Sequence, residues 1–323
     1  MKILITGTCG FIGYSLAESL LKKNIIVYGI DNLNDYYSVS IKKLRLKNLK
    51  KNKNFIFKKI DISNRNLLFK FFKKKKIDII FNFAAQAGVR YSLKKPDTYF
   101  FSNLIGFLNI VDLANILKTK KIFYASSSSV YGDAKTYPVK EKFELNPKNI
   151  YGLTKKINEI SARTFSLNSK IEFIGLRFFT VFGEWGRPDM MLFKVLNSFK
   201  KKKLFYLNEG GKHLRDFTYI KDVVSILNIL LKKKFKNNFE LFNVCSNSPL
   251  KVANVIDEMQ RNLNGLKIKI VNPKILKKIE VNKTHGNNKK ITKLIKNNKF
   301  TSFKKALKNT IDWYMKNKIY KIT

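Results

Sequence analysis

The chain has few thiols and few nitrogen ligands for a metal. Among 323 residues it contains two cysteines, Cys9 and Cys245, and two histidines, His213 and His285. Two cysteines give no disulfide framework, and these scattered side chains do not form a cluster at metal-ligand spacing. We therefore expect no bound metal and a chemistry that proceeds without one.

Long apolar runs and acidic residues are scarce as well. No run approaches the roughly 18 apolar residues that cross a bilayer, and the apolar N-terminus does not end in a cleavage site, so we expect a soluble, cytoplasmic protein with no membrane partner. Acidic residues number 22 against 65 basic ones. Because the lysines are spread along the whole chain and are enriched together with Asn, Ile and Phe, they indicate a compositional bias, and we expect no specific nucleic-acid partner.

The first 31 residues follow the pattern of a strand, a glycine turn and a helix that hold a dinucleotide. An apolar strand at residues 2–5 precedes Gly7, Gly10 and Gly13, and a second strand ends at Asp31, 18 residues beyond Gly13. Gly7 permits a tight turn, Gly10 lets the backbone approach a pyrophosphate, and Gly13 allows close packing of helix on strand. A carboxylate at Asp31 accepts ribose hydroxyls and repels a 2′-phosphate, so the segment predicts NAD over NADP.

Apolar strands alternate with helical patterns through the first half of the chain. The expected strands cover residues 55–57, 77–82 and 122–125, and the expected helices cover 67–72, 103–117 and 151–167. This alternation predicts an α/β fold, a Rossmann-like doubly wound parallel sheet with ligands outside the carboxyl ends of its strands. We expect an NAD-binding domain at 1–177, completed by about 218–245, and a smaller C-terminal α/β substrate-binding region at 178–217 and 246–323.

Tyr151 and Lys155 are the catalytic candidates. They stand four residues apart at the start of an expected helix. Both therefore lie on one helix face, where an ammonium lowers the pKa of a phenol and holds a phenolate near neutrality. The same spacing recurs at Tyr91, Tyr131 and Tyr314. Context favours Tyr151, because it alone follows a hydroxyl-rich strand end by about 25 residues and begins a long helix.

Serines and arginines supply the remaining candidates. Ser126 to Ser129 follow an apolar strand, and we expect one of them to hydrogen-bond the reacting oxygen of a substrate and to share its proton with Tyr151. Eight of the 65 basic residues are arginine. Two explanations fit an arginine in so lysine-rich a chain. Either the position needs a bidentate fork for a carboxylate or phosphate, or the arginine is retained by chance. Arg90, Arg187 and Arg215 each follow a glycine-containing loop, a place for ligand contacts.

These motifs together resemble the extended short-chain dehydrogenase/reductase family of NAD-dependent sugar-nucleotide epimerases and dehydratases. The resemblance covers nearly the whole chain. Its core motifs are Thr6-Gly7-x-x-Gly10-x-x-Gly13, Asp31-Asn32, Asn82-x-Ala84-Ala85, the run from Ser126 to Gly132, and Tyr151-x-x-x-Lys155. Residues 31–37, 84–92, 176–183, 185–190 and 215–220 resemble the UDP-glucuronate 4-epimerases within that family.

The resemblance implies a reversible oxidation at one sugar carbon. Tyr151 takes the proton of the 4-hydroxyl while NAD takes the C4 hydride; the 4-keto sugar turns over, and the hydride returns to its opposite face. Lys155 is implied to bind the nicotinamide ribose and to lower the Tyr151 pKa, and Ser127 matches the catalytic serine position. The implied cofactor contacts are Gly7, Gly10, Phe11, Ile12, Gly13, Asp31, Asn32, Asp61, Ile62, Ala84, Ala85, Asn103, Tyr151 and Lys155. The implied substrate contacts are Arg90, Ser127, Ser128, Ser129, Thr180, Arg187, which would grip a sugar carboxylate, and Arg215, which would bind the diphosphate.

The most specific expectation is conversion of UDP-glucuronate to UDP-galacturonate. A homodimer is also expected, in which the helices at 103–117 and 151–167 pair with those of the second copy. Dehydratases of the family carry an Asp-Glu pair, and UDP-glucuronate decarboxylases a Glu, where this chain has Ser128 and Ser129. No carboxyl group is therefore ready there for those reactions. A 4-epimerase of UDP-glucose or UDP-N-acetylglucosamine is the closer alternative, because the core machinery is shared.

A binding protein is the alternative from another class. In this hypothesis the protein binds a dinucleotide but catalyses no reaction, and its positive surface binds RNA or another anionic partner. Tyr151, Lys155 and Ser127 argue against it, because a binding module does not need a polarised tyrosine.

Overall fold

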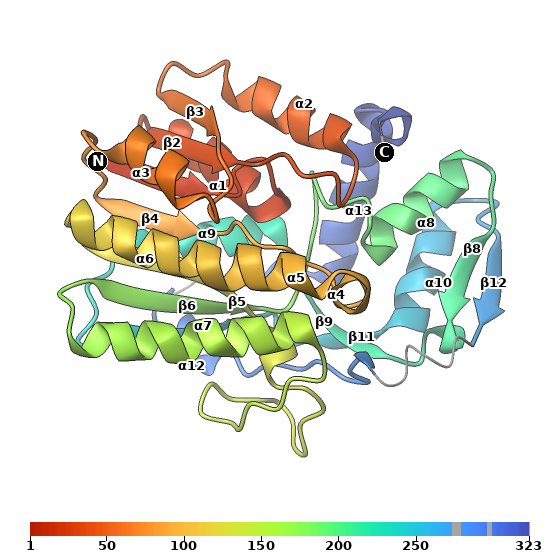
Figure 1. Cartoon of the computed structure of the whole chain (residues 1–323). Helices are drawn as coiled ribbons and strands as arrows, with labels where there is room; N and C mark the ends of the chain where they lie inside the picture. The colour runs from red at the N-terminus through yellow and green to blue at the C-terminus, as the bar shows by residue number, and fades with distance from the viewer. Residues whose placement is uncertain (273–278, 296–298, 323) are drawn as a thin grey trace.

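A seven-stranded parallel sheet forms the centre of the computed structural model, which describes residues 1–272, 279–295 and 299–322 (Figure 1). The strand order across the sheet is β10-β6-β5-β4-β1-β2-β3. The strands are β1 (Lys2–Thr6), β2 (Ile26–Asp31), β3 (Phe55–Lys59), β4 (Ile79–Asn82), β5 (Lys121–Ser127), β6 (Glu172–Phe178) and β10 (Phe239–Val244). The Rossmann-like parallel sheet predicted from the sequence is confirmed.

The strands of this sheet are apolar because helices cover both of its faces. Ile3, Leu4 and Ile5 of β1 are fully buried, and their side chains pack alternately into the two cores. One core includes side chains of α1 (Phe11–Leu21), α2 (Val39–Leu49) and α9 (Ile220–Lys232). The other includes side chains of α3 (Arg65–Phe72), α6 (Gly106–Ile116) and α7 (Ile150–Leu167). Among the residues described, the faces of the sheet are thus covered, and the loops at its carboxyl edge line the clefts.

The strand order reverses between β1 and β4, which pair directly although 72 residues separate their ends. Helices leave β1 and β4 on opposite faces at this point, so a crevice opens outside the carboxyl ends of the strands. The loops that follow β1, β2, β4 and β5 all begin at this edge. The topology therefore brings the glycine loop, Asp31, Ala84 and the serine run to one place.

The remaining elements form a smaller region beside the sheet. Its strands are β7 (Thr180–Phe182), β9 (Leu214–Tyr219) and β11 (Pro249–Lys251) in one sheet, and β8 (Phe205–Asn208) and β12 (Ile268–Val271) in another. Its helices are α8 (Met191–Lys200), α10 (Val252–Asn262) and α13 (Phe303–Lys316), whereas α12 (Lys289–Thr292) packs against β10 of the central sheet. In Figure 1, α8, α10, β8 and β12 lie together on one side of the central sheet. A loosening of the alternation after Arg177 was expected, and the short strands of this region match it.

One stretch is longer and more apolar than the sequence analysis allowed. Residues Pro96–Ile116 run through α5 (Pro96–Tyr99), a π-helical segment η1 (Phe100–Ile105) and α6, with a mean hydropathy of 1.3 over a membrane-length window. By length and composition alone it could cross a bilayer. Half of that window is buried inside the protein, as in a helix that packs on a core.

Candidate active site

The glycine loop makes a cradle with no room for side chains. Gly7 has φ +67°, and a Cβ there would lie 2.8 Å from the Ala84 nitrogen in the loop after β4. A Cβ on Gly13 would lie 2.3 Å from the Gly7 carbonyl oxygen. Close packing of Gly13 on the strand was expected; the structure shows instead that its crowding partner is the loop itself. The bare loop at the N-terminus of α1 fits the pyrophosphate of a dinucleotide.

Asp31 ends β2 with its carboxylate fixed by the backbone. Its Oδ2 accepts the Cys9 N–H at 2.9 Å, and its Oδ1 accepts the Leu33 N–H at 2.8 Å. Burial raises the pKa of Asp31, because the charged form loses solvation. Two hydrogen bonds leave lone pairs on both oxygens, so the carboxylate can still accept the hydroxyls of a ribose.

Two clefts open at the carboxyl edge of the sheet. The cofactor cleft is lined by thirteen of the fourteen expected cofactor contacts: Gly7, Gly10, Phe11, Ile12, Gly13, Asp31, Asn32, Asp61, Ile62, Ala84, Ala85, Tyr151 and Lys155. The substrate cleft has a volume of about 1020 Å³ and is lined by all seven expected substrate contacts: Arg90, Ser127, Ser128, Ser129, Thr180, Arg187 and Arg215. Ser127 and Tyr151 line both clefts. A proton-exchanging hydroxyl at this junction could act on a substrate beside a cofactor.

Tyr151 and Lys155 occupy successive turns at the start of α7. The helix begins where the Asn149 side chain accepts the Gly152 N–H at 2.9 Å, which satisfies an otherwise unpaired amide. The Lys155 Nζ lies 5.9 Å from the centre of the Tyr151 ring. Burial lowers the pKa of Lys155 to about 8, because an ammonium is poorly solvated there. The helix thus presents both groups on one face, as the spacing predicted.

A lowered pKa was expected for the Tyr151 hydroxyl, but in the protein without a cofactor this pKa is raised. Burial raises the pKa of its hydroxyl above the ordinary value, and side-chain hydrogen bonding with Ser127 and the charge of Arg187 oppose that rise without overcoming it. Lys155 is not among the groups that lower this pKa. The four-residue spacing predicted the position of the Lys155 ammonium correctly. It gives no information on how strongly burial raises the pKa of Tyr151. The free protein therefore holds a neutral phenol at neutral pH.

The four serines divide between two tasks. Ser126 donates its hydroxyl to Glu159 in the interior, so it is a structural member of the run. The Ser127 oxygen accepts the Ser129 N–H at 3.1 Å and caps the short helix η2 (Ser128–Val130). That helix turns Ser128 and Ser129 toward the substrate cleft. One serine was expected to face the substrate, and the structure places Ser127 on the wall of both clefts.

Asn103 does not line the cofactor cleft, contrary to expectation. It is 2% exposed; its Nδ2 donates to the Gln86 carbonyl at 3.1 Å and to the Thr154 hydroxyl at 3.0 Å, and its Oδ1 accepts the Gln86 N–H at 2.8 Å. The π-helical turn that contains it places Ser102, and not Asn103, on the cleft wall. Asn103 therefore fixes the loop after β4 against α7.

The arginines reach the substrate cleft with partners already in place. Arg187 donates from Nε and Nη2 to the two carboxylate oxygens of Asp189, the first at 3.0 Å. Arg90 donates to Glu280 at 2.6 Å, and Arg215 donates to two backbone carbonyls. A free bidentate fork was expected at Arg187. Instead one edge is taken by Asp189, and the guanidinium carbon lies 5.6 Å from the centre of the Tyr36 ring.

Arg45 was not among the predicted site residues. It is fully buried and comes from α2, and its Nη1 donates to the Cys9 carbonyl at 2.8 Å in the glycine loop. Its Nη2 donates to the Trp185 carbonyl and, at 3.2 Å, to the Gly186 carbonyl. The guanidinium thus ties the glycine loop to the segment that carries Arg187. The retention of arginine in a lysine-rich chain was the signal, but only arginines after glycine loops were considered.

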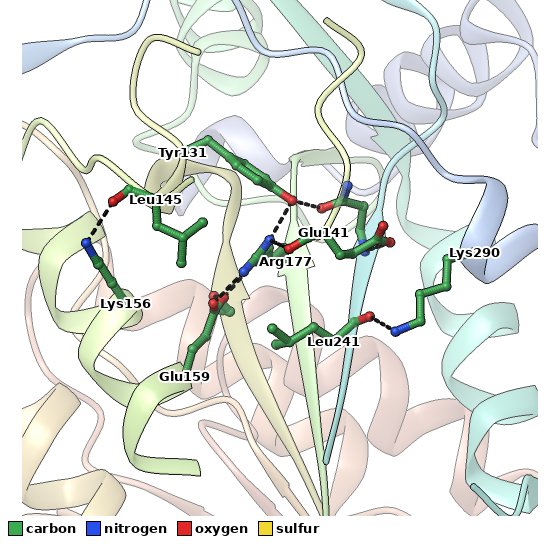
Figure 2. Close-up of polar contacts among 10 residues, drawn as sticks. Tyr131, Glu141, Leu145, Lys156, Glu159, Arg177, Leu241 and Lys290 are labelled. Atoms are coloured by element: carbon green, nitrogen blue, oxygen red, sulfur yellow. Dashed lines mark hydrogen bonds and ion pairs between the residues drawn. The ribbon is translucent and has the colours of Figure 1, made fainter. Parts of the chain in front are cut away.

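A buried polar network lies behind the serine run (Figure 2). Glu159 is 3% exposed, and its two oxygens accept Nε and Nη2 of Arg177 at 2.8 and 2.6 Å. Arg177 also donates to the Tyr131 hydroxyl at 2.7 Å, and Tyr131 donates to Asn243 at 2.7 Å. The network joins α7, β6, β10 and the segment after β5, so it fixes the strand end from which Ser127 projects.

The chain matches known proteins along nearly its whole length. Residues 3–245 match the NAD dependent epimerase/dehydratase family. Protein CapI of Staphylococcus aureus is 37% identical, with 98% of each chain covered. A UDP-glucuronate 4-epimerase of Thermodesulfobacterium geofontis is 35% identical, with 97% of this chain and 96% of that one covered.

A solved structure supports the same family assignment. The UDP-glucuronic acid 4-epimerase from Bacillus cereus, in complex with UDP-glucuronic acid and NAD, superposes with a TM-score of 0.89 at 27% identity and covers 98% of this chain and 100% of that chain. The likeness therefore extends over nearly the whole of both chains. The chain belongs to the NAD dependent epimerase/dehydratase family, as an isomerase whose cofactor is NAD.

Proposed function

We propose that the protein epimerises a UDP-sugar at C4, with UDP-glucuronate and UDP-galacturonate as its pair of substrates. The observation that carries the proposal is that Tyr151 and Ser127 line both the cofactor cleft and the substrate cleft. Epimerase relatives at 35% identity, and the bound UDP-glucuronic acid of the Bacillus cereus structure, support the choice of substrate.

The residues present fit NAD. The glycine cradle would be filled by a single Cβ, and Asp31 offers lone pairs at the end of β2 where an adenosine ribose would lie. When bound, NAD supplies the acceptor and donor of the hydride, and the positive charge of its oxidised ring favours a phenolate nearby. Lys155 would bind the nicotinamide ribose through its ammonium.

Tyr151 would move the proton of the sugar 4-hydroxyl. As a phenolate it accepts this proton while the hydride leaves C4, and a 4-keto sugar results. The sugar turns over within the substrate cleft, the hydride returns to the opposite face, and Tyr151 gives the proton back to the oxygen. Ser127 would hydrogen-bond that oxygen during both steps, because it lines both clefts beside Tyr151.

The side chains of the substrate cleft support the choice of sugar. Ser128 and Ser129 supply hydroxyls and no carboxylate, so no acid or base stands there for elimination, and Thr180 and Arg187 supply further donors. We propose that Nη1 of Arg187 and these hydroxyls hold the sugar carboxylate. A 4-epimerase of UDP-glucose or UDP-N-acetylglucosamine remains the second candidate, because Asp189 already neutralises Arg187.

Chromatography of the products from purified protein incubated with UDP-glucuronate, and separately with UDP-glucose, tests the proposal. Formation of UDP-galacturonate at a higher kcat/KM than that of UDP-galactose is the expected result. A preference for the neutral sugar would select the second candidate. Tight, specific RNA binding in a salt titration, with no interconversion of either sugar, would support the binding-protein alternative and overturn the enzyme reaction.

Arg187→Leu should damage turnover of UDP-glucuronate more than that of UDP-glucose, by roughly ten- to a hundredfold in kcat/KM, since a hydrogen bond to a charged group is lost. The substitution also leaves Asp189 unpaired in the cleft, where it repels a carboxylate. Arg187→Leu combined with Asp189→Asn removes that repulsion and is the matched control. Equal losses with both sugars would show that Arg187 does not read the carboxylate.

We propose that two copies associate through the outer face of η1, α6 and α7. Phe101, Ile160 and Leu167 on these helices are 61%, 56% and 77% exposed, and Ile116 is 60% exposed. Such an apolar face favours a two-fold contact. Light scattering after gel filtration should give a dimer for the native chain and for Ile270→Glu, an exposed residue of β12, and a monomer for Ile160→Glu. A native monomer would refute the dimer.

We also propose the division of the chain into an NAD-binding domain at 1–177 with 218–245, and a substrate-binding region at 178–217 with 246–323. It is supported by the place of β10 in the central sheet and of Thr180, Arg187 and Arg215 in the substrate cleft. A soluble, cytoplasmic location accords with the substrate class, because nucleotide sugars are intracellular metabolites.

A further inference from the structure

Three loops from distant parts of the chain meet at the hydroxyl of Tyr36. Tyr36 follows β2, and its hydroxyl donates to Oδ2 of Asp189 at 3.1 Å, across 153 residues of sequence. Its ring packs against the ring of Tyr91, with their centres 4.9 Å apart. Asp189 is in turn paired with Arg187. Tyr36 thus joins the loop after β2 to the segment after β7.

The third loop, which follows β4, leaves space for Tyr36 to cross. Gly88 has φ +103°, a backbone conformation that side chains rarely adopt. A Cβ on Gly88 would lie 2.0 Å from the Tyr36 hydroxyl oxygen, closer than any two such atoms approach. Glycine at this position is therefore explained by the path of Tyr36 toward Asp189.

The hydrogen bond lies where the two clefts adjoin. Tyr36, Arg187 and Met190 line the cofactor cleft and the substrate cleft alike. The loop after β2 forms one wall of the cofactor cleft, and Arg187 and Met190 form part of another. Opening the cleft by moving these walls apart would break the bond between Tyr36 and Asp189. Burial opposes the charge of Asp189, but Arg187 and Tyr36 lower the pKa of its carboxyl, so the acceptor is a carboxylate at neutral pH.

We infer that Tyr36 is a positioning residue that latches the cofactor cleft shut through Asp189 and so holds NAD between turnovers. The reason rests on the proposed function, because a hydride that returns to the same sugar requires a cofactor that stays in place throughout the cycle. Tyr36 does not touch the reacting carbon in this scheme. It acts through the Asp189 carboxylate on the loops that border the cleft.

The test measures release of NAD from the purified holoenzyme. The protein is diluted into ethanol and alcohol dehydrogenase, which reduces each released NAD and reports it by absorbance. Tyr36→Phe keeps the ring against Tyr91 and deletes only the hydroxyl. Tyr91→Phe is the matched control, because it deletes a hydroxyl from the same aromatic cluster that has no hydrogen-bond partner within the residues described. Thermal melting of both variants checks that they are folded.

Tyr36→Phe should release NAD about tenfold faster than the native protein, since the lost hydrogen bond has a charged acceptor. Tyr91→Phe should release it at the native rate. In an Asp189→Asn background the effect of Tyr36→Phe should shrink, because the two groups act as one unit. An unchanged rate for Tyr36→Phe, an equal rise for Tyr91→Phe, or an undiminished effect in the Asp189→Asn background would each overturn the latch.

A readout during turnover separates the latch from the proposed reaction. With UDP-glucuronate, Tyr36→Phe should accumulate free NADH, detected by its absorbance after filtration, because some cycles end with the cofactor released before the hydride returns. If the native protein does not interconvert UDP-sugars, the proposed function fails while the release measurement still judges the latch. If turnover is normal and neither NAD release nor NADH accumulation rises in Tyr36→Phe, the latch fails alone.

Discussion

Tyr151→Phe should lower epimerisation by about a thousandfold, within the 10²- to 10⁴-fold range of a general acid or base, while NAD stays bound. The substitution removes only the oxygen that exchanges a proton with the sugar. The ring keeps its edge contact with Tyr99, whose centre lies 6.3 Å away, and the N-cap of α7 at Asn149 is untouched. The loss should therefore appear in kcat, because ground-state binding is retained.

Product chromatography over time gives the rate, and acid extraction of the purified variant gives its NAD content. Tyr28→Phe is the control, because Tyr28 is a buried residue of β2 that lines neither cleft. It should retain native turnover. Substantial epimerisation by Tyr151→Phe would remove Tyr151 from the proton transfer, and loss of NAD together with activity would show that its role is structural.

Arg177→Met should lower the free energy of unfolding by about 3–5 kcal/mol, the cost of leaving one partner of a buried ion pair uncompensated. Both oxygens of Glu159 depend on Arg177, and neither side chain is more than 4% exposed (Figure 2). Tyr131 and the Glu141 carbonyl would lose a donor at the same time. The variant should be the least stable of those considered, and the strand end that carries Ser127 should loosen with it.

Urea unfolding followed by circular dichroism measures this loss. Arg65→Met is the control, because Arg65 pairs with Asp112 on the surface, where both side chains are about half exposed, and such pairs contribute about 1 kcal/mol or less. Arg177→Met combined with Glu159→Leu should recover much of the stability, since no charge then stays buried alone. A loss for Arg177→Met as small as that for Arg65→Met would show that the network contributes little.

Local patterns predicted the contacts that lie within one segment or at the end of one strand. The glycine loop, Asp31, the serine run and the start of α7 were placed correctly, because each depends on a short stretch of sequence and the topology of a parallel sheet collects strand ends at one edge. Asn103 was misplaced. The family resemblance implied this contact, whereas in the structure Asn103 lies in a π-helical turn at residues 100–105 and bonds to Gln86 and Thr154 instead.

By itself, then, the sequence determined the fold class, the preference for NAD and the candidates Tyr151 and Lys155, because these follow from hydrophobic periodicity and from residues near each other along the chain, and the family resemblance implied the other side chains of the two clefts. The tertiary structure decided which charges those side chains meet. Asp189 neutralises Arg187 and binds Tyr36, Arg45 ties the glycine loop to the segment that carries Arg187, and burial outweighs every group that lowers the pKa of Tyr151. Pairing and desolvation depend on distances between segments far apart in sequence, and only packing sets those distances.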